Sequence, residues 1–166
     1  MALRGIRKWQ ILATGVALLL IAAAVTWLLW PDAKAPAPRE RQYRATTACL
    51  LTDDKGVVGD PAKAAWAGMQ EASTATLIKV QYLSIAGPQT AANGLSYFNS
   101  LGVQKCTVIV AAGPAPVAAM VEGYKQFPDV RMVAVAGDIK DAPLTAIDGP
   151  AAAIQSGVRA VVEKAA

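Results

Sequence analysis

Residues 11–30 are a run of twenty uncharged, mostly apolar residues, and this run constrains the 166-residue chain more than any other feature. A helix that rises about 1.5 Å per residue would carry this run across roughly 30 Å, the thickness of the hydrocarbon core of a bilayer. Basic residues precede the run, and tryptophans stand near both of its ends, as at membrane interfaces: Arg4, Arg7, Lys8, Trp9, Trp27 and Trp30. We therefore expect residues 11–30 to form a transmembrane anchor.

Two other interpretations of this run stay open. A cleaved secretory signal has about 7 to 15 apolar residues and a small-x-small cleavage site. The run is longer than that, although Ala33-Lys34-Ala35 follows it. A buried soluble helix would also be apolar on every side, but it rarely stands at a terminus with basic flanks.

The composition divides the chain into four parts. Residues 1–10 are a short tail that we place in the cytoplasm, followed by the predicted anchor. Residues 31–44 hold three prolines and six charged residues without an apolar period, which is typical of an extended linker. Residues 45–166 are long enough for one domain with one core. Basic residues flank the anchor on both sides, so their number does not settle its orientation. The short tail and the two cysteines favour a single-pass protein of the cell membrane with an extracytoplasmic domain.

Charge and residue types exclude several classes of function. The formal net charge is +4, but residues 45–166 contain nine Lys or Arg against ten Asp or Glu. A nearly neutral domain lacks the basic footprint of a nucleic-acid-binding protein. The chain has no histidine, which removes Ser-His-Asp and Cys-His nucleophiles and the usual zinc sites. We expect no enzyme activity, no cofactor, no metal site and no nucleic-acid partner.

Apolar strands alternate with helical patterns after the linker. Continuous apolar strands with helices between them indicate a parallel sheet that is covered on both faces. We predict one α/β domain with a single doubly wound parallel sheet in the order 2-1-3-4-5 and flanking helices. The predicted strands are 48–51, 76–85, 106–112, 131–136 and 144–147, and the apolar helix faces fall within 60–73, 95–101, 117–124 and 154–162.

The two cysteines fall near the starts of the first and third strands, which are neighbours in this order. We expect Cys49 and Cys106 to form a disulfide at the edge of the sheet opposite any ligand. Closing a loop of about 58 residues would stabilise the fold by roughly 4 kcal/mol in the chain-entropy model. Two reduced thiols that pack as small apolar side chains are the alternative.

A candidate ligand site lies at the other edge, because open parallel sheets bind ligands at the carboxyl ends of their strands. Asp53 and Asp54 follow the first strand, Gly113 follows the third, and Asp138 follows the fourth. Their carboxylates could accept hydrogen bonds from sugar hydroxyls or bind a cation. Turn and cap chemistry explains aspartate at strand ends equally well. Neither a GxGxxG motif nor P-loop spacing is present.

Roughly residues 46–166 resemble the basic membrane protein family, the purine-nucleoside-type substrate-binding components of bacterial ABC transporters. The resemblance lies in the order of four segments: CLLTDDKGVVGDPAKAAWAGMQEA, FNSLGVQKCTVIVAAG, MVEGYKQFPDVRMVAVAGD and IDGPAAAIQSGVRAVVEKA. It implies a type I periplasmic-binding fold, with Asp53, Gly113 and Asp138 at the family's ligand positions.

This chain departs from the family in three ways. Family members close two lobes on a ligand, whereas this sequence matches the N-terminal lobe alone. The first loop is shorter, with Asp60-Pro61-Ala62-Lys63 in place of the family's Asp and Ser-Phe-Asn stretch. Pro114 stands where the family has an aromatic residue that would stack on a nucleobase.

Two functions follow from the sequence. The first is a membrane-anchored, solute-binding-protein-like module that binds a nucleoside-like or other small polar ligand weakly, or with a second copy or ABC-transporter subunits. It predicts a polar pocket with Asp53, Asp54 and Asp138. The second is a tethered protein-interaction module that keeps the fold without the site. It predicts an exposed apolar patch where the missing lobe would have packed.

Overall fold

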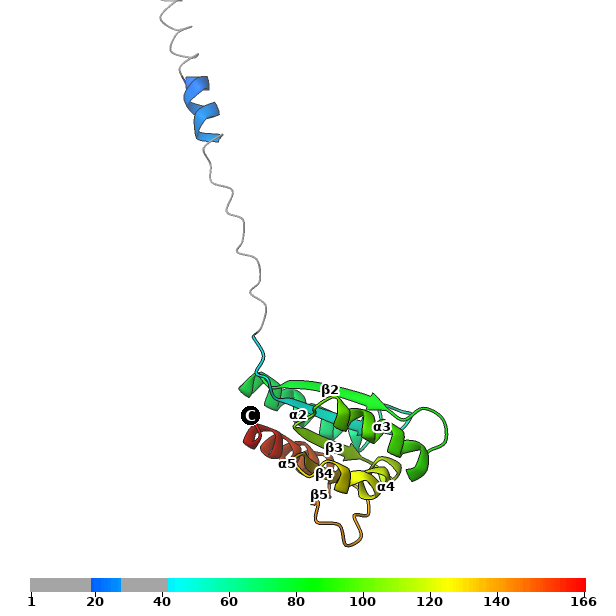
Figure 1. Cartoon of the computed structure of the whole chain (residues 1–166). Coiled ribbons are helices and arrows are strands. Elements are labelled where there is room, and N and C mark those ends of the chain that lie inside the picture. The colour runs from blue at the N-terminus through cyan, green and yellow to red at the C-terminus, as the bar shows by residue number, and fades with distance from the viewer. Residues whose placement is uncertain (1–18, 28–41) are drawn as a thin grey trace, which may run out of the picture. The chain divides into compact units, whose positions relative to one another are not determined.

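The computed structural model describes residues 19–27 and 42–166 (Figure 1). The chain divides into two units, Met1–Glu40 and Arg41–Ala166. In the first unit, residues 19–27 are helical. Among the residues described, no helix has both the length and the hydropathy needed to cross a bilayer. The predicted tail 1–10, residues 11–18 and 28–30 of the predicted anchor and most of the predicted linker lie outside the described residues, so the anchor remains a prediction.

The second unit contains a five-stranded, all-parallel sheet in the order β2-β1-β3-β4-β5. This confirms the predicted α/β class and strand order. The strands are β1 (Thr47–Thr52), β2 (Lys79–Ser84), β3 (Val108–Ala112), β4 (Arg131–Val135) and β5 (Thr145–Ile147). Thr47 pairs with Lys79, and Val108 pairs with both Ala48 and Arg131. The first four strands therefore start level with one another and define an amino-terminal edge of the sheet.

Helices cover both faces of the sheet. They are α2 (Ala62–Thr76), α3 (Ala91–Val103), α4 (Pro114–Gly123) with the 3-10 turn η1 (Tyr124–Gln126), and α5 (Ala151–Lys164). Alternate strand side chains enter two apolar layers, as the pleat requires. Leu50 and Val110 pack with residues of α2 and α5, whereas Leu51 and Ile109 pack with those of α3 and α4. The central strands β1, β3 and β4 are thus largely buried on both faces, as their unbroken apolar runs predict, whereas the edge strands β2 and β5 are partly exposed.

The predicted start of the second strand is wrong. The β-branched run from Thr76 predicts a strand, yet α2 continues to Thr76 and β2 begins at Lys79. Leu77 takes the left-handed conformation (φ 62°) and donates its N–H to the carbonyl of Ser73. The Ser73 hydroxyl donates to the carbonyl of Ile78 at 2.8 Å. Packing of the buried α2 face outweighs the strand propensity of two threonines at its exposed end.

The connection from β4 to β5 is a loop, residues 136–144, and not a helix. Ile139 and Leu144 in this loop pack against the apolar layer under α3 and α4. They replace part of the cover that a helix would give to this face of the sheet. The loop also leaves a hollow beside the start of β4.

The predicted disulfide between Cys49 and Cys106 is confirmed, with a Cα–Cα distance of 5.9 Å. Both residues are buried, at 0% and 1% exposed. Cys106 stands two residues before β3, so the bond joins β1 to the segment that leads into β3. The amide of Gln81 on β2 lies 3.2 Å from the Cys49 sulfur and donates to the side chain of Gln104 at 3.0 Å.

Candidate functional site

The carboxyl ends of the strands bring the predicted site residues to one edge of the sheet. Asp53 is half-buried, directly after β1, and its Oδ1 accepts a hydrogen bond from the backbone N–H of Lys55 at 3.0 Å. Its carbonyl accepts from the N–H of Gly56 at 3.1 Å. Asp53 therefore holds the turn after β1, whereas Asp54 is exposed.

Asp138 plays the same part after β4. Its Oδ1 accepts from the backbone N–H of Lys140 at 2.8 Å, and the residue is exposed. An aspartate that accepts the amide two residues ahead forms an Asx turn, which is common where a strand ends in a loop. The turn chemistry left open by the sequence thus accounts for one oxygen of Asp53 and one of Asp138. The second oxygen of each is left for other contacts.

Gly113 links β3 to α4 with a φ of +98°, a conformation that favours glycine. A Cβ at this position would meet nothing within 4 Å, so the space over the residue is open. The start of α4 is nevertheless a poor anion site. The N–H of Gly113 donates to Val135 and that of Val117 to Gly113, and the prolines at 114 and 116 have no N–H. Only the amide of Ala115 is left from the donors that a helix start usually offers.

A polar pair at the ends of β1 and β2 was missed by the sequence analysis. The hydroxyl oxygens of Thr52 and Ser84 lie 3.2 Å apart, and Thr52 is fully buried. The turn at Gly56 folds over them, since a Cβ there would lie 3.3 Å from the Ser84 hydroxyl. The only signal in the sequence is that both strands end in a hydroxyl residue.

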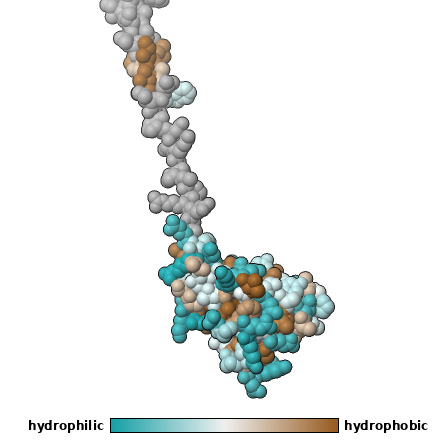
Figure 2. Space-filling model, in the orientation of Figure 1, coloured by the Kyte–Doolittle hydropathy of each residue, from teal (hydrophilic) through white to brown (hydrophobic). Residues whose placement is uncertain are grey.

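Exposed apolar residues at this edge are few. Val58, in the loop after β1, is 81% exposed, and Pro88 and Pro114 are also exposed. On the face shown in Figure 2, hydrophobic residues of the domain are scattered among hydrophilic ones. The edge therefore mixes carboxylates with single apolar side chains, and its described residues do not form the exposed apolar patch that the protein-interaction module predicts.

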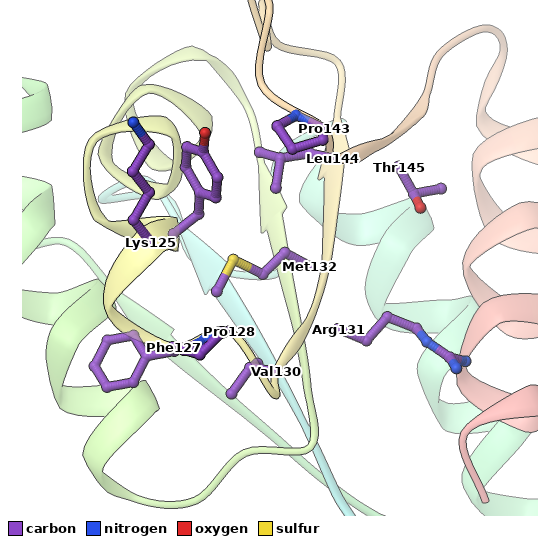
Figure 3. Close-up of a pocket in the computed structure, with 10 residues that line it drawn as sticks. Lys125, Phe127, Pro128, Val130, Arg131, Met132, Pro143, Leu144 and Thr145 are labelled. Atoms are coloured by element: carbon purple, nitrogen blue, oxygen red, sulfur yellow. The ribbon is translucent and has the colours of Figure 1, made fainter.

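Three surface hollows lie elsewhere, and none of them is lined by a predicted ligand residue. One, of about 540 Å³, lies between η1, the start of β4 and the segment 143–145, at the amino-terminal edge (Figure 3). The other two lie over α2 and α5 around Glu71 and Arg159. Arg159 binds Glu163 at 2.7 Å and Glu71 at 3.4 Å, and the hydrogen bond to Glu163 is the main cause that raises its pKa.

No family model and no curated protein matches this sequence. Solved structures do resemble it. A fragment of a candidate lipoprotein from Peptoclostridium difficile 630 has a TM-score of 0.58 at 14% identity, over 72% of this chain and 98% of that chain. A candidate transcription repressor of the LacI family from Corynebacterium glutamicum has a TM-score of 0.50 at 13% identity, over 75% of this chain and 51% of that chain.

A solute-binding protein of an ABC transporter system from Aeropyrum pernix K1 has a TM-score of 0.49 at 16% identity, over 61% of this chain and 28% of that chain. At such identities a likeness shows the fold alone. The class is therefore an α/β domain that spans about half of a LacI-family protein and nearly all of the lipoprotein fragment. The comparisons support the fold implied by the family resemblance, and they do not show membership of the basic membrane protein family.

Proposed function

We propose that this chain is a membrane-tethered, extracytoplasmic module with the fold of one lobe of a solute-binding protein, and that it presents the carboxyl edge of its sheet to a partner protein. The observation that carries this proposal is the use of the predicted ligand residues within their own loops. Asp53 and Asp138 each accept a backbone amide two residues ahead. The chain is not an enzyme in this proposal.

The openness of the carboxyl edge also supports a protein partner. Good small-molecule sites bury about 70–90% of the ligand surface. A Cβ on the buried Gly113 would meet nothing within 4 Å, and Asp54 and Val58 in the loop after β1 are exposed. A second molecule must supply the opposite wall, and that molecule is a partner protein or a second copy of this chain.

A second candidate is a weak ligand-binding module for a nucleoside-like or other small polar ligand, with ABC-transporter subunits as partners. The free second oxygens of Asp53 and Asp138, on either side of the open space over Gly113, favour it. Pro114 offers no ring for stacking on a base, which weakens a nucleoside in particular.

The tether rests on the apolar run 11–30 and is consistent with the lipoprotein description of the solved fragment. The chain enters the domain at the amino-terminal edge, where the N–H of Arg44 donates to the carbonyl of Leu77 at 2.8 Å. The carboxyl edge is thus the end of the domain opposite the point of attachment.

Site-specific photo-crosslinking of the full chain in its own membrane tests the proposal. A photoreactive residue at Val58 is expected to capture one defined protein, and the matched residue at Ser156 on α5 is not. The double substitution Asp53→Lys and Asp138→Lys should reduce the Val58 product. Equal products from both positions would overturn the partner surface.

A thermal-shift screen of residues 42–166 against nucleosides and simple sugars separates the second candidate. A ligand at a hundred times its Kd adds about 2.7 kcal/mol to the free energy of unfolding. Asp53→Asn keeps the oxygen that accepts the Lys55 N–H. A rise in melting temperature that a ligand causes in the wild type, and that this variant abolishes, would support a ligand site instead.

A further inference from the structure

The charged side chains of the domain are divided between the two edges of the sheet. Five exposed cations stand where strands begin or helices end, on the amino-terminal edge: Lys79, Lys105, Lys125, Arg131 and Lys164. Exposed Glu122 and Asp129 are close to them along the chain, exposed Asp141 is in the loop that runs to this edge, and Glu163 is paired with Arg159. The carboxyl edge has the opposite excess, with Asp53, Asp54, Asp60, Asp138 and Asp148 against Lys55, Lys63 and Lys140. A nearly neutral domain therefore has one basic edge and one acidic edge.

Helix dipoles explain part of this division. Cations near helix C-termini are favourable, which accounts for Lys125 in η1 and Lys164 in the last turn of α5. Arg131 and Lys79 begin strands, where no helix dipole favours a cation. Among residues 42–166, none of the five basic-edge cations is in an ion pair. These charges remain available to an external anionic surface.

The N-terminal part of the chain joins the domain at this same edge. Besides its bond to Leu77, Arg44 donates from its guanidinium to the carbonyl of Ala166 at 2.7 Å, so the segment before β1 lies beside Ala166 (Figure 1). The segment before it, residues 31–44, adds Lys34, Arg39 and Arg41. Any membrane that holds residues 11–30 is within reach of the basic edge through a linker of fourteen residues.

We propose that the basic amino-terminal edge docks on an anionic lipid surface. The proposal rests on the tether of the proposed function, because tethering raises the local concentration of the membrane surface and makes weak contacts effective. Juxtamembrane Lys and Arg are attracted to anionic lipids in this way. Docking leaves the acidic carboxyl edge pointing away from the bilayer and open to a partner.

The hollow at this edge places an apolar surface between two cations. Lys125 and Arg131 line it on either side of Met132, which lies between them with Leu144 nearby (Figure 3). Phe127 and Val130 complete an apolar wall. In this view the Lys125 ammonium and the Arg131 guanidinium point away from each other, so each cation can contact the phosphate of a separate headgroup (Figure 3). The hollow has a volume of about 540 Å³, which is within the range of small-molecule sites.

Vesicle flotation of residues 42–166 tests the docking, since this segment contains both apolar layers and the disulfide. A thermal melt of each variant establishes that it is folded. The domain is expected to float with vesicles that contain phosphatidylglycerol, not with pure phosphatidylcholine, and to be released by high salt. Lys125→Glu with Arg131→Glu should weaken binding by more than roughly fivefold per side chain, since each basic residue contributes about that factor.

The matched control is Lys55→Glu with Lys63→Glu, which changes the net charge equally at the acidic edge and should leave flotation unchanged. Equal loss in both variants, equal binding to neutral vesicles or absence of binding by the folded wild-type domain would each overturn the proposal. Salt-sensitive binding to poly-glutamate without vesicle binding would assign the edge to an acidic protein instead.

Alkaline carbonate washing of membranes that hold the full chain tests the tether separately. If the full chain stays in the membrane after the wash but residues 42–166 do not bind vesicles, the tether is supported and the docking proposal is wrong. If residues 42–166 bind anionic vesicles but the wash removes the full chain from the membrane, the anionic-lipid surface is supported and the tether is wrong.

Discussion

Gly68 in α2 lies directly against the backbone carbonyl of Gln155 in α5, so closely that a Cβ on residue 68 would overlap the carbonyl oxygen. The absence of a side chain lets the two helices over this face of the sheet approach each other. The same layer buries Met69 and Ala72 of α2 against Val158 and Val162 of α5.

Gly68→Ala is expected to destabilise the domain by about 1–3 kcal/mol, because the methyl group must push two helix backbones apart. Chemical denaturation of residues 42–166 measures the effect. Gly157→Ala is the control, since its Cβ would meet only the side chain of Ile147, at 3.1 Å, and alanine favours a helix. A Gly68→Ala variant as stable as the control variant would contradict the close approach.

Replacing the disulfide by Cys49→Ala with Cys106→Ala should lower the free energy of unfolding by about 2–4 kcal/mol. The bond closes a long loop in the unfolded chain, and both residues are buried in the native state. Urea denaturation of the oxidised wild type and the double variant provides the comparison. Equal unfolding midpoints with equal slopes would mean that the bond does not restrict the unfolded chain.

The turn after β1 should depend on the acceptor oxygen of Asp53 and not on its charge. Asp53→Asn keeps an oxygen for the Lys55 N–H and is expected to stay close to wild type in stability. Asp53→Ala removes the acceptor and should cost about 0.5–1.5 kcal/mol. Thermal melts of the two variants distinguish these outcomes. If Asp53→Ala were as stable as Asp53→Asn, the hydrogen bond to Lys55 would not stabilise the turn.

Ser73→Ala is expected to cost about 1 kcal/mol, because the nearly buried hydroxyl satisfies the carbonyl of Ile78 between α2 and β2. Ser156→Ala on the exposed face of α5 tests the same chemical change, and it removes only a local hydrogen bond of 3.2 Å to Ala153. If chemical denaturation gave the wild-type free energy of unfolding for both variants, Ser73 would have no part in ending α2.

The order of elements follows from the sequence because periodicity is local. The apolar run CTVIVAA predicts a buried strand and is β3, apart from its first two residues. The pattern of Val117, Met120 and Val121 predicts the helix that became α4. The boundary at Thr76 is wrong because the burial of Ala72 and Ser73 extends α2 beyond what local propensity indicates.

The candidate site depends more on the tertiary structure. The sequence places Asp53, Gly113 and Asp138 at one edge, since parallel strands all end there. It leaves open whether the carboxylate oxygens of Asp53 and Asp138 face a ligand or their own turns. A single hydrogen bond from a backbone amide to each carboxylate decides this, and the sequence does not show that bond. The Thr52–Ser84 pair joins two strands whose register no local pattern specifies.

The sequence by itself determined the α/β class of the domain, because apolar periodicity is carried by short segments. The strand order and the cysteine pairing were predictions from that class, and the structure confirms both. Only the tertiary structure decided the division of charge between a basic and an acidic edge. Lys79, Arg131 and Lys164 are far apart in the chain, and they share an edge only because parallel strands start, and the helices between them end, on the same side of the sheet.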